Sequence, residues 1–214
     1  MNRTPQSERA EYARKLRHNG EFTEAAFYYL AAAQGWFMRS RNVPGDNMGE
    51  YSLAHFGYGI QDLTAAILCC RIAEKPELSN DFCEIGIINT RLLRDHDPTF
   101  QEADSKAYRG LFEEIHGDFS ILGNLSDSNQ HYTRATSIYK DVENHRNWQA
   151  ESEFHSTIQT VLELGDSAGI EITESERSQI EYESLTKRVM FKQKHYPEII
   201  KGVLQNGNWD SEVI

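Results

Sequence analysis

Apolar residues recur at spacings of three and four along most of the chain, and the strict alternation typical of β-strands is nearly absent. The longest stripe runs from Met48 to about Glu74, where Lys75-Pro76 ends it. Similar stripes predict further helices over Ser7–His18, Phe22–Phe37, Ser79–Arg94, Phe100–Leu125, Tyr132–His145, Trp148–Leu164 and Thr173–Lys194. Pro197 is expected to open a last helix that ends at Gln205.

These elements predict an all-α chain of about eight to ten helices, forming one domain over residues 1–205 and a frayed tail over 206–214. The 214 residues are 39% hydrophobic, which is enough for a folded core. No apolar run approaches the ~18 residues that span a bilayer, and the polar N-terminus lacks a secretory signal, so we expect no membrane insertion. Three cysteines, two of them adjacent, predict a reducing, cytoplasmic location.

The chain is acidic, with 33 Asp and Glu residues against 22 Lys and Arg residues and a net charge of −11. Such a surface repels a phosphate backbone, so we do not expect a nucleic-acid partner. The richest basic stretch, Lys187-Arg188 through Lys192 and Lys194, is interpreted as a solvated helix face. The acidity also hints at a source adapted to high salt.

Two stretches of the chain repeat one pattern at an offset of 110 residues. They are Gly20-x-Phe22-x-x-Ala25-x-x-x-Tyr29-x-x-Ala32 and Gln130-x-Tyr132-x-x-Ala135-x-x-x-Tyr139-x-x-Val142. In each, a small residue lets a neighbouring helix approach closely and two aromatic rings wedge between the pair. Leu122-Gly123 precedes the second copy, where a first helix would end.

This pattern resembles the second helix of the tetratricopeptide repeat, and Leu122-Gly123 matches the Leu-Gly pair of that repeat's first helix. The resemblance implies a right-handed superhelix of antiparallel helical hairpins, and longer hairpins like those of SNAP-type adaptors fit the middle equally well. The chain, including Gly117-Asp118-Phe119-x-x-x-Gly123, also resembles helical-repeat proteins of haloarchaea. Neither resemblance implies a catalytic activity.

The tetratricopeptide resemblance places Arg14, Arg17, His18 and Asn124 on a concave binding face. Arginine suits bidentate recognition of carboxylates or phosphates, and asparagine can hydrogen-bond a peptide backbone. The resemblance therefore implies a scaffold or adaptor that binds a protein or peptide and needs no cofactor, as a monomer or a homodimer. Further candidate anchors for a partner are three large aromatic residues: Phe37, Trp148 and Trp209.

The sequence offers little catalytic or metal-binding chemistry. Glu113-x-x-His116 has the spacing found in di-iron helical bundles but has no second copy, so we interpret it as an exposed helix and expect no metal site. Cys70 extends an apolar stripe and is predicted in the core, whereas Cys69 is a candidate for a partly exposed thiol.

Two alternative functions remain open. Arg91-x-x-x-x-His96 resembles the Arg-x4-His motif of HEPN-type ribonucleases, which implies an Arg and a His acting on the phosphate and 2′-OH of RNA in a helical dimer. The other alternative is a regulatory helical domain that binds a small ligand between its helices. A pocket with convergent polar groups would indicate that function.

Overall fold

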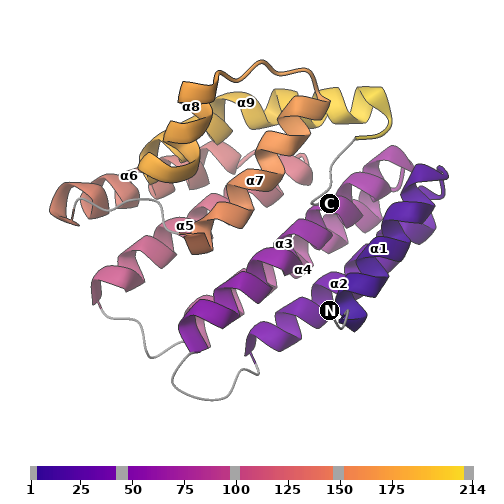
Figure 1. Ribbon diagram of the computed structural model, residues 1–214, viewed down its shortest axis with the longest axis horizontal. Helices are drawn as coiled ribbons and strands as arrows, with labels where there is room; N and C mark the ends of the chain where they lie inside the picture. Colours follow the sequence, from indigo (N-terminus) through magenta and orange to yellow (C-terminus); the bar gives the residue numbers. More distant parts are fainter. Residues whose placement is uncertain (1–3, 42–47, 97–101, 147–151, 210–214) are drawn as a thin grey trace.

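The computed structural model describes residues 4–41, 48–96, 102–146 and 152–209 (Figure 1). Every regular element in these ranges is helical, which confirms the all-α class. The elements are α1 (Pro5–His18), α2 (Phe22–Arg41), α3 (Met48–Ile72), α4 (Pro76–His96), α5 (Glu102–Leu122), α6 (Ser128–Arg146), α7 (Ser152–Ser167), α8 (Glu174–Ser178), the π-helical turn η1 (Gln179–Glu183) and α9 (Leu185–Asn206). Among the described helices, none is long and apolar enough to cross a membrane.

The helices pack in chain order at first and then fold back on one another. Each of α1 to α5 contacts the next helix, while α7 packs on α3, and α9 lies across α5, α6 and α7 (Figure 1). In a solenoid each repeat contacts only its neighbours. Because α7 and α9 add contacts between distant parts of the chain, the expected right-handed superhelix is not confirmed.

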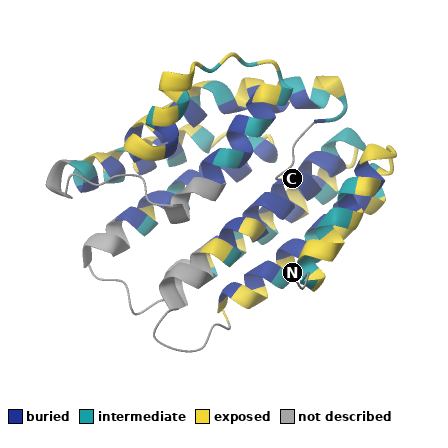
Figure 2. Cartoon of the chain, viewed as in Figure 1, coloured by how far each residue is buried: buried dark blue, intermediate teal, exposed yellow. Residues whose placement is uncertain are grey.

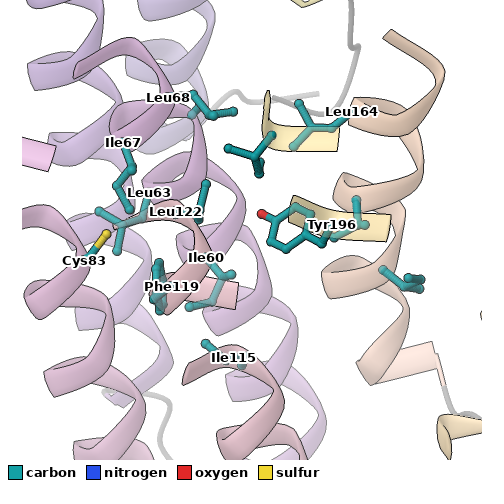
Figure 3. Close-up of a cluster of buried hydrophobic side chains, with 14 of the residues drawn as sticks. Ile60, Leu63, Ile67, Leu68, Cys83, Ile115, Phe119, Leu122, Leu164 and Tyr196 are labelled. Atoms are coloured by element: carbon teal, nitrogen blue, oxygen red, sulfur yellow. The ribbon is translucent and has the colours of Figure 1, made fainter. Parts of the chain in front are cut away.

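The core is centred on α3, whose last four turns are buried on nearly all sides (Figure 2). Its apolar side chains face residues from α4, α5, α7 and α9 in one cluster (Figure 3). Cys70 belongs to this core, as predicted. The expectation of a partly exposed Cys69 is wrong, because helices cover α3 on several sides and Cys69 has no exposed surface.

The aromatic residues of the repeated pattern fit against glycines of the neighbouring helix. Tyr132 and Tyr139 of α6 are buried, and their rings lie over Gly117 and Gly110 of α5. A Cβ atom on Gly117 would lie 2.6 Å from Cε1 of Tyr132. The close approach of α5 and α6 therefore depends on the absence of a side chain at Gly110 and Gly117, in line with the predicted wedging of aromatic rings between the helices.

The helix boundaries differ from the sequence prediction at the C-terminal end. The helix predicted over Thr173–Lys194 is interrupted at Ser184, whose extended backbone (φ −151°) ends η1 and whose Oγ accepts the backbone N–H of Lys187 to cap α9. The break predicted at Pro197 is absent, because this exposed proline removes one hydrogen bond while buried apolar residues on either side hold α9 in place.

The described part of the C-terminal tail is ordered by contacts with the rest of the chain. Gly207, at φ +67°, closes α9 with its N–H on the carbonyl of Val203. Trp209 is only 3% exposed. The fraying expected from residue 206 is thus wrong for residues 206–209, and the rest of the predicted tail lies outside the described residues.

Candidate functional site

The four residues predicted to bind a partner do not share one surface. Arg14 lines a pocket between α1, α2 and α3, and His18 lines a smaller hollow beside Trp209. Asn124 lies in a third hollow, between the end of α5 and α9. Arg17 is fully buried beneath the C-terminal tail. The structure thus places three of the four residues around α1 and separates Asn124 from them.

The pocket that contains Arg14, which we call the α1–α3 pocket, has a volume of about 620 Å³. Helix α1 contributes positions 7, 10, 11 and 14, which share one face because they are spaced by three and four residues. Helix α3 contributes positions 58, 61 and 62 from one face, and α2 contributes Trp36. The complete lining is Ser7, Ala10, Glu11, Arg14, Trp36, Tyr58, Gln61 and Asp62.

Asp62 is the most deeply placed ionisable group of the α1–α3 pocket, with 6% of its surface exposed. Burial raises the pKa of its carboxyl group to about 8, although a hydrogen bond from Trp36 and the charge of Arg14 both act to lower it. Nε of Arg14 is buried without a hydrogen-bond partner. A buried acid and an incompletely paired arginine therefore border the same pocket, as is common at binding sites.

Aromatic rings form one wall of the α1–α3 pocket. The rings of Trp36 and Tyr58 lie 5.2 Å apart, and the imidazole of His55 stacks on Trp36 at 5.4 Å. The guanidinium of Arg39 lies 5.9 Å from the Trp36 ring. These contacts fix the indole, whereas the Tyr58 ring is 48% exposed and its surface is accessible to a ligand. Sequence reasoning found Arg14 but missed this wall and Asp62, because Gln61-Asp62 lies within a long apolar stripe.

Arg17 binds the chain's own tail. Its Nη1 donates a 2.6 Å hydrogen bond to the carbonyl of Trp209, and its guanidinium lies 4.1 Å from the centre of the Trp209 ring. Burial lowers the pKa of Arg17, and nearby Tyr29 partly opposes this effect. Arg17 and Trp209 are buried against each other. Arg17 is therefore not available on an open concave face, and Trp209 is not a surface anchor.

The other predicted aromatic anchors also differ from expectation. Phe37 is 2% exposed, and its ring packs on α3 over Gly59. It therefore belongs to the α2–α3 contact, so the prediction of a surface anchor is wrong for Phe37. Trp148 lies outside the described residues.

The hollow around Asn124 is lined by polar and apolar residues alike and has a volume of about 560 Å³. Asn124 adopts a left-handed conformation (φ +56°) in the turn after α5. Arg71 of α3 also lines this hollow, and its Nη1 donates to the carbonyl of Leu122 at 3.1 Å. This hydrogen bond satisfies a carbonyl at the end of α5, so Arg71 stabilises the helix terminus.

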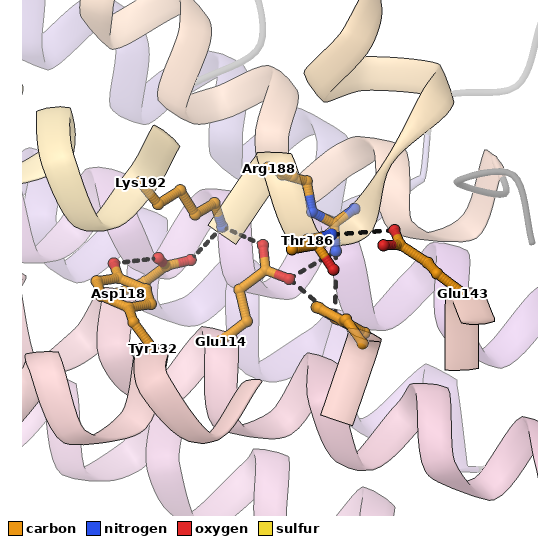
Figure 4. Close-up of polar contacts among 8 residues, drawn as sticks. Glu114, Asp118, Tyr132, Glu143, Thr186, Arg188 and Lys192 are labelled. Carbon is orange, nitrogen blue, oxygen red and sulfur yellow. Dashed lines mark hydrogen bonds and ion pairs between the residues drawn. The ribbon is translucent and has the colours of Figure 1, made fainter. Parts of the chain in front are cut away.

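A buried network of charges links α5 to α9 (Figure 4). Arg188 and Lys192, one turn apart on α9, face Glu114 and Asp118, one turn apart on α5. Nη2 of Arg188 lies 2.6 Å from Glu114, and Nζ of Lys192 lies 2.8 Å from Glu114 and 2.6 Å from Asp118. The interpretation of this basic stretch as a solvated face is wrong for Arg188 and Lys192, which have no exposed surface.

Tyrosines of α6 complete the network. The Tyr139 hydroxyl donates to Glu114 at 2.9 Å, and the Tyr132 hydroxyl donates to Asp118 at 2.7 Å. Burial acts to raise the pKa of Glu114, but Arg188 and Lys192 outweigh it and hold the pKa at about 2. Burial raises the pKa of Asp118 to about 6, with Lys192 opposing. Because two acids balance two bases inside the protein, the network holds α9 on the α5–α6 hairpin.

The Glu113-x-x-His116 motif is not an exposed helix face. His116 is buried, and its ring lies 5.3 Å from that of His131. Nδ1 of His131 lies 2.8 Å from Oε2 of Glu113, which also lies 3.8 Å from Nη1 of Arg134. In the described parts of the chain, no group of three or more His, Cys, Asp or Glu side chains is placed to hold a metal ion.

The alternative ribonuclease motif is only partly described. Arg91 is exposed on α4, and the side chain of His96 lies outside the described residues. The pairing of these two residues in one active site therefore stays a prediction.

Comparison of the chain with protein-family models, with curated proteins and with solved structures gives no significant match.

Proposed function

We propose that this chain is a protein-interaction module, a scaffold or adaptor without catalysis of its own, and that its partner binds at the α1–α3 pocket. One observation carries the proposal. Arg14, selected from the sequence as a partner-binding residue, lies in a pocket with Trp36 and Tyr58, and these three residue types are enriched among the anchors of protein interfaces.

The packing of the helices supports a tetratricopeptide-like architecture as part of this proposal. The hairpins α1–α2 and α5–α6 each carry the aromatic and small-residue pattern on the second helix, with Tyr29 and Tyr139 buried. The cysteines of the described residues are free and buried, which favours a reducing, cytoplasmic location for the module.

Site-specific photo-crosslinking in the cells that produce the protein tests the proposal. The crosslinker p-benzoylphenylalanine replaces Ser7, an exposed residue at the edge of the pocket, or Ser137, an exposed residue on α6. We expect the crosslinker at position 7 to capture a defined protein that the crosslinker at position 137 does not capture. Arg14→Ala should abolish that capture, whereas Arg9→Ala, an exposed position on the same helix, should not.

Equal capture at positions 7 and 137 would overturn the proposal, and so would the absence of any captured protein at position 7. Circular dichroism of the Arg14→Ala and Arg9→Ala chains establishes that each remains folded. Capture that persists undiminished in a folded Arg14→Ala chain would also contradict the assigned site.

A further inference from the structure

Asp62 of α3 is the inner acid of the α1–α3 pocket, which Glu11 and Arg14 of α1 also line. Glu11 pairs with Lys15 at 3.2 Å. The charge of Arg14 favours the Asp62 carboxylate, but burial outweighs it. Tyr29 of α2 also lies near Asp62, and burial raises the pKa of its phenol to about 12, so it stays neutral and adds no charge. Ionisation of this buried carboxyl group is unfavourable, and a ligand that supplied a further positive charge beside it would offset that cost.

The geometry around Asp62 is also suited to a cation. The Trp36 indole donates a hydrogen bond to the carboxyl group and is held by His55 and Arg39. The Tyr58 ring is half exposed on the pocket wall, and the face of such a ring attracts an ammonium or guanidinium group. A charged head could therefore reach Asp62 while its aliphatic stem packs on Tyr58.

We propose that the group entering the α1–α3 pocket is a cationic lysine or arginine side chain of the partner, paired with Asp62. This inference rests on the proposed function, because it takes the pocket to be the partner site. The net charge of −11 acts in the same direction, since it attracts a basic segment and repels an acidic one.

A proton balance follows from this pairing. With a pKa of about 8, the Asp62 carboxyl group is mostly protonated at pH 7 in the free protein. A bound cation favours the carboxylate. The protonated acid and the cationic side chain therefore give an ion pair and one proton released to solvent. No redox change or co-reactant is involved.

The test uses the full chain and capped amino acids as probes. Nα-acetyl-lysine-N-methylamide and its arginine counterpart are compared with the neutral norleucine and the acidic glutamate analogues. Binding is followed by the NMR signal of the Trp36 indole, assigned with Trp36→Phe. We expect the cationic probes to bind at least about tenfold more tightly than norleucine, and Asp62→Asn to remove this preference. Asp81→Asn, an exposed carboxylate on α4, is the matched control and should change nothing.

Titration calorimetry at pH 7 in two buffers of different ionisation enthalpy measures the number of protons released when a probe binds. We expect close to one proton released per cationic probe in the wild type and none in Asp62→Asn. Equal binding of lysine and norleucine probes, or preferential binding of the glutamate probe, would overturn the inference. If Arg14→Ala abolishes capture of the partner while Asp62→Asn does not, the pocket stands as the partner site and only the cationic ligand is wrong. If neither variant alters capture, the proposed function itself is wrong.

Discussion

Nη2 of Arg188 on α9 lies 2.6 Å from Oε2 of Glu114 on α5, and neither side chain has any exposed surface. The residues are 74 positions apart, so this contact holds the C-terminal helix on the α5–α6 hairpin. Loss of Arg188 leaves a single buried cation, Lys192, to balance two buried acids, Glu114 and Asp118. We therefore expect Arg188→Met to lower the free energy of unfolding by about 3–5 kcal/mol, measured by urea denaturation.

Two controls separate the effect of charge pairing from a general sensitivity of α9 to substitution. Lys194→Met removes an exposed cation from the same helix and should change stability by no more than about 0.5 kcal/mol. The double variant Glu114→Gln/Arg188→Met should recover much of the loss, because no unpaired charge remains at that pair. If Arg188→Met is no more destabilising than Lys194→Met, the network does not hold α9 in place.

The contact between α2 and α3 depends on Gly59. A Cβ atom at this position would lie 2.5 Å from Cε1 of Phe37, closer than packed atoms allow. We expect Gly59→Ala to destabilise the protein by about 1–3 kcal/mol, measured by thermal and urea unfolding.

A double-variant cycle tests the Gly59 explanation. Phe37→Leu removes the ring and leaves room for the methyl group, so Gly59→Ala should cost much less in that background. Strictly additive effects of the two substitutions would show that the ring does not limit the approach of the helices.

The fold class could be predicted because helical periodicity is a local property of the sequence. The long stripe over α3 and the spacing of Tyr132, Ala135 and Tyr139 on α6 each mark a buried face that the structure contains. Thr173, predicted to begin a helix, does accept the backbone N–H of Glu176 at the start of α8. These features need no knowledge of distant residues.

The remaining features depend on contacts between distant parts of the chain. Arg188 and Lys192 have the spacing of a solvated face, and only the acids of α5, 74 positions away, make their burial possible. Trp209 is ordered by Arg17, which lies 192 positions away. Asp62 was missed for the same reason, since its pocket is formed only when α1 and α2 pack beside α3.

The contact between Arg17 and Trp209 predicts that the tail stabilises α1. Trp209→Ala removes a buried ring and exposes the Arg17 guanidinium. We expect a loss of about 3–5 kcal/mol in unfolding free energy and faster amide hydrogen exchange in α1. Met190→Ala, at an exposed apolar position on α9, is the control and should have little effect. Unchanged exchange in α1 would be inconsistent with a tail that stabilises this helix.

The three cysteines are expected to be unreactive in the folded protein. Burial raises the pKa of Cys70 and Cys83 to about 12, and that of Cys69 further still. At pH 8 we expect an aromatic disulfide reagent to label all three at least about a hundredfold more slowly in the native protein than in urea. A cysteine introduced by Ser137→Cys, at an exposed position on α6, should react at once. Rapid labelling of Cys69 in native protein would mean that the cover over α3 opens readily.

Asp62 should make stability depend on pH. Its pKa is raised by burial from 3.8 to about 8, so between these pH values the folded chain holds a proton that the unfolded chain has lost. Folding then takes up a proton at this group, so the contribution of Asp62 to the unfolding free energy falls as pH rises from about 4 to about 8 and then levels off. An asparagine side chain cannot ionise, so Asp62→Asn should gain stability over the wild type by a few kcal/mol between pH 5 and pH 8.

Urea unfolding of both chains across this range measures the difference, and Asp81→Asn corrects for the loss of one negative charge. A difference that stays constant with pH, or that shrinks toward pH 8, would mean that the Asp62 carboxyl group is already ionised in the free protein.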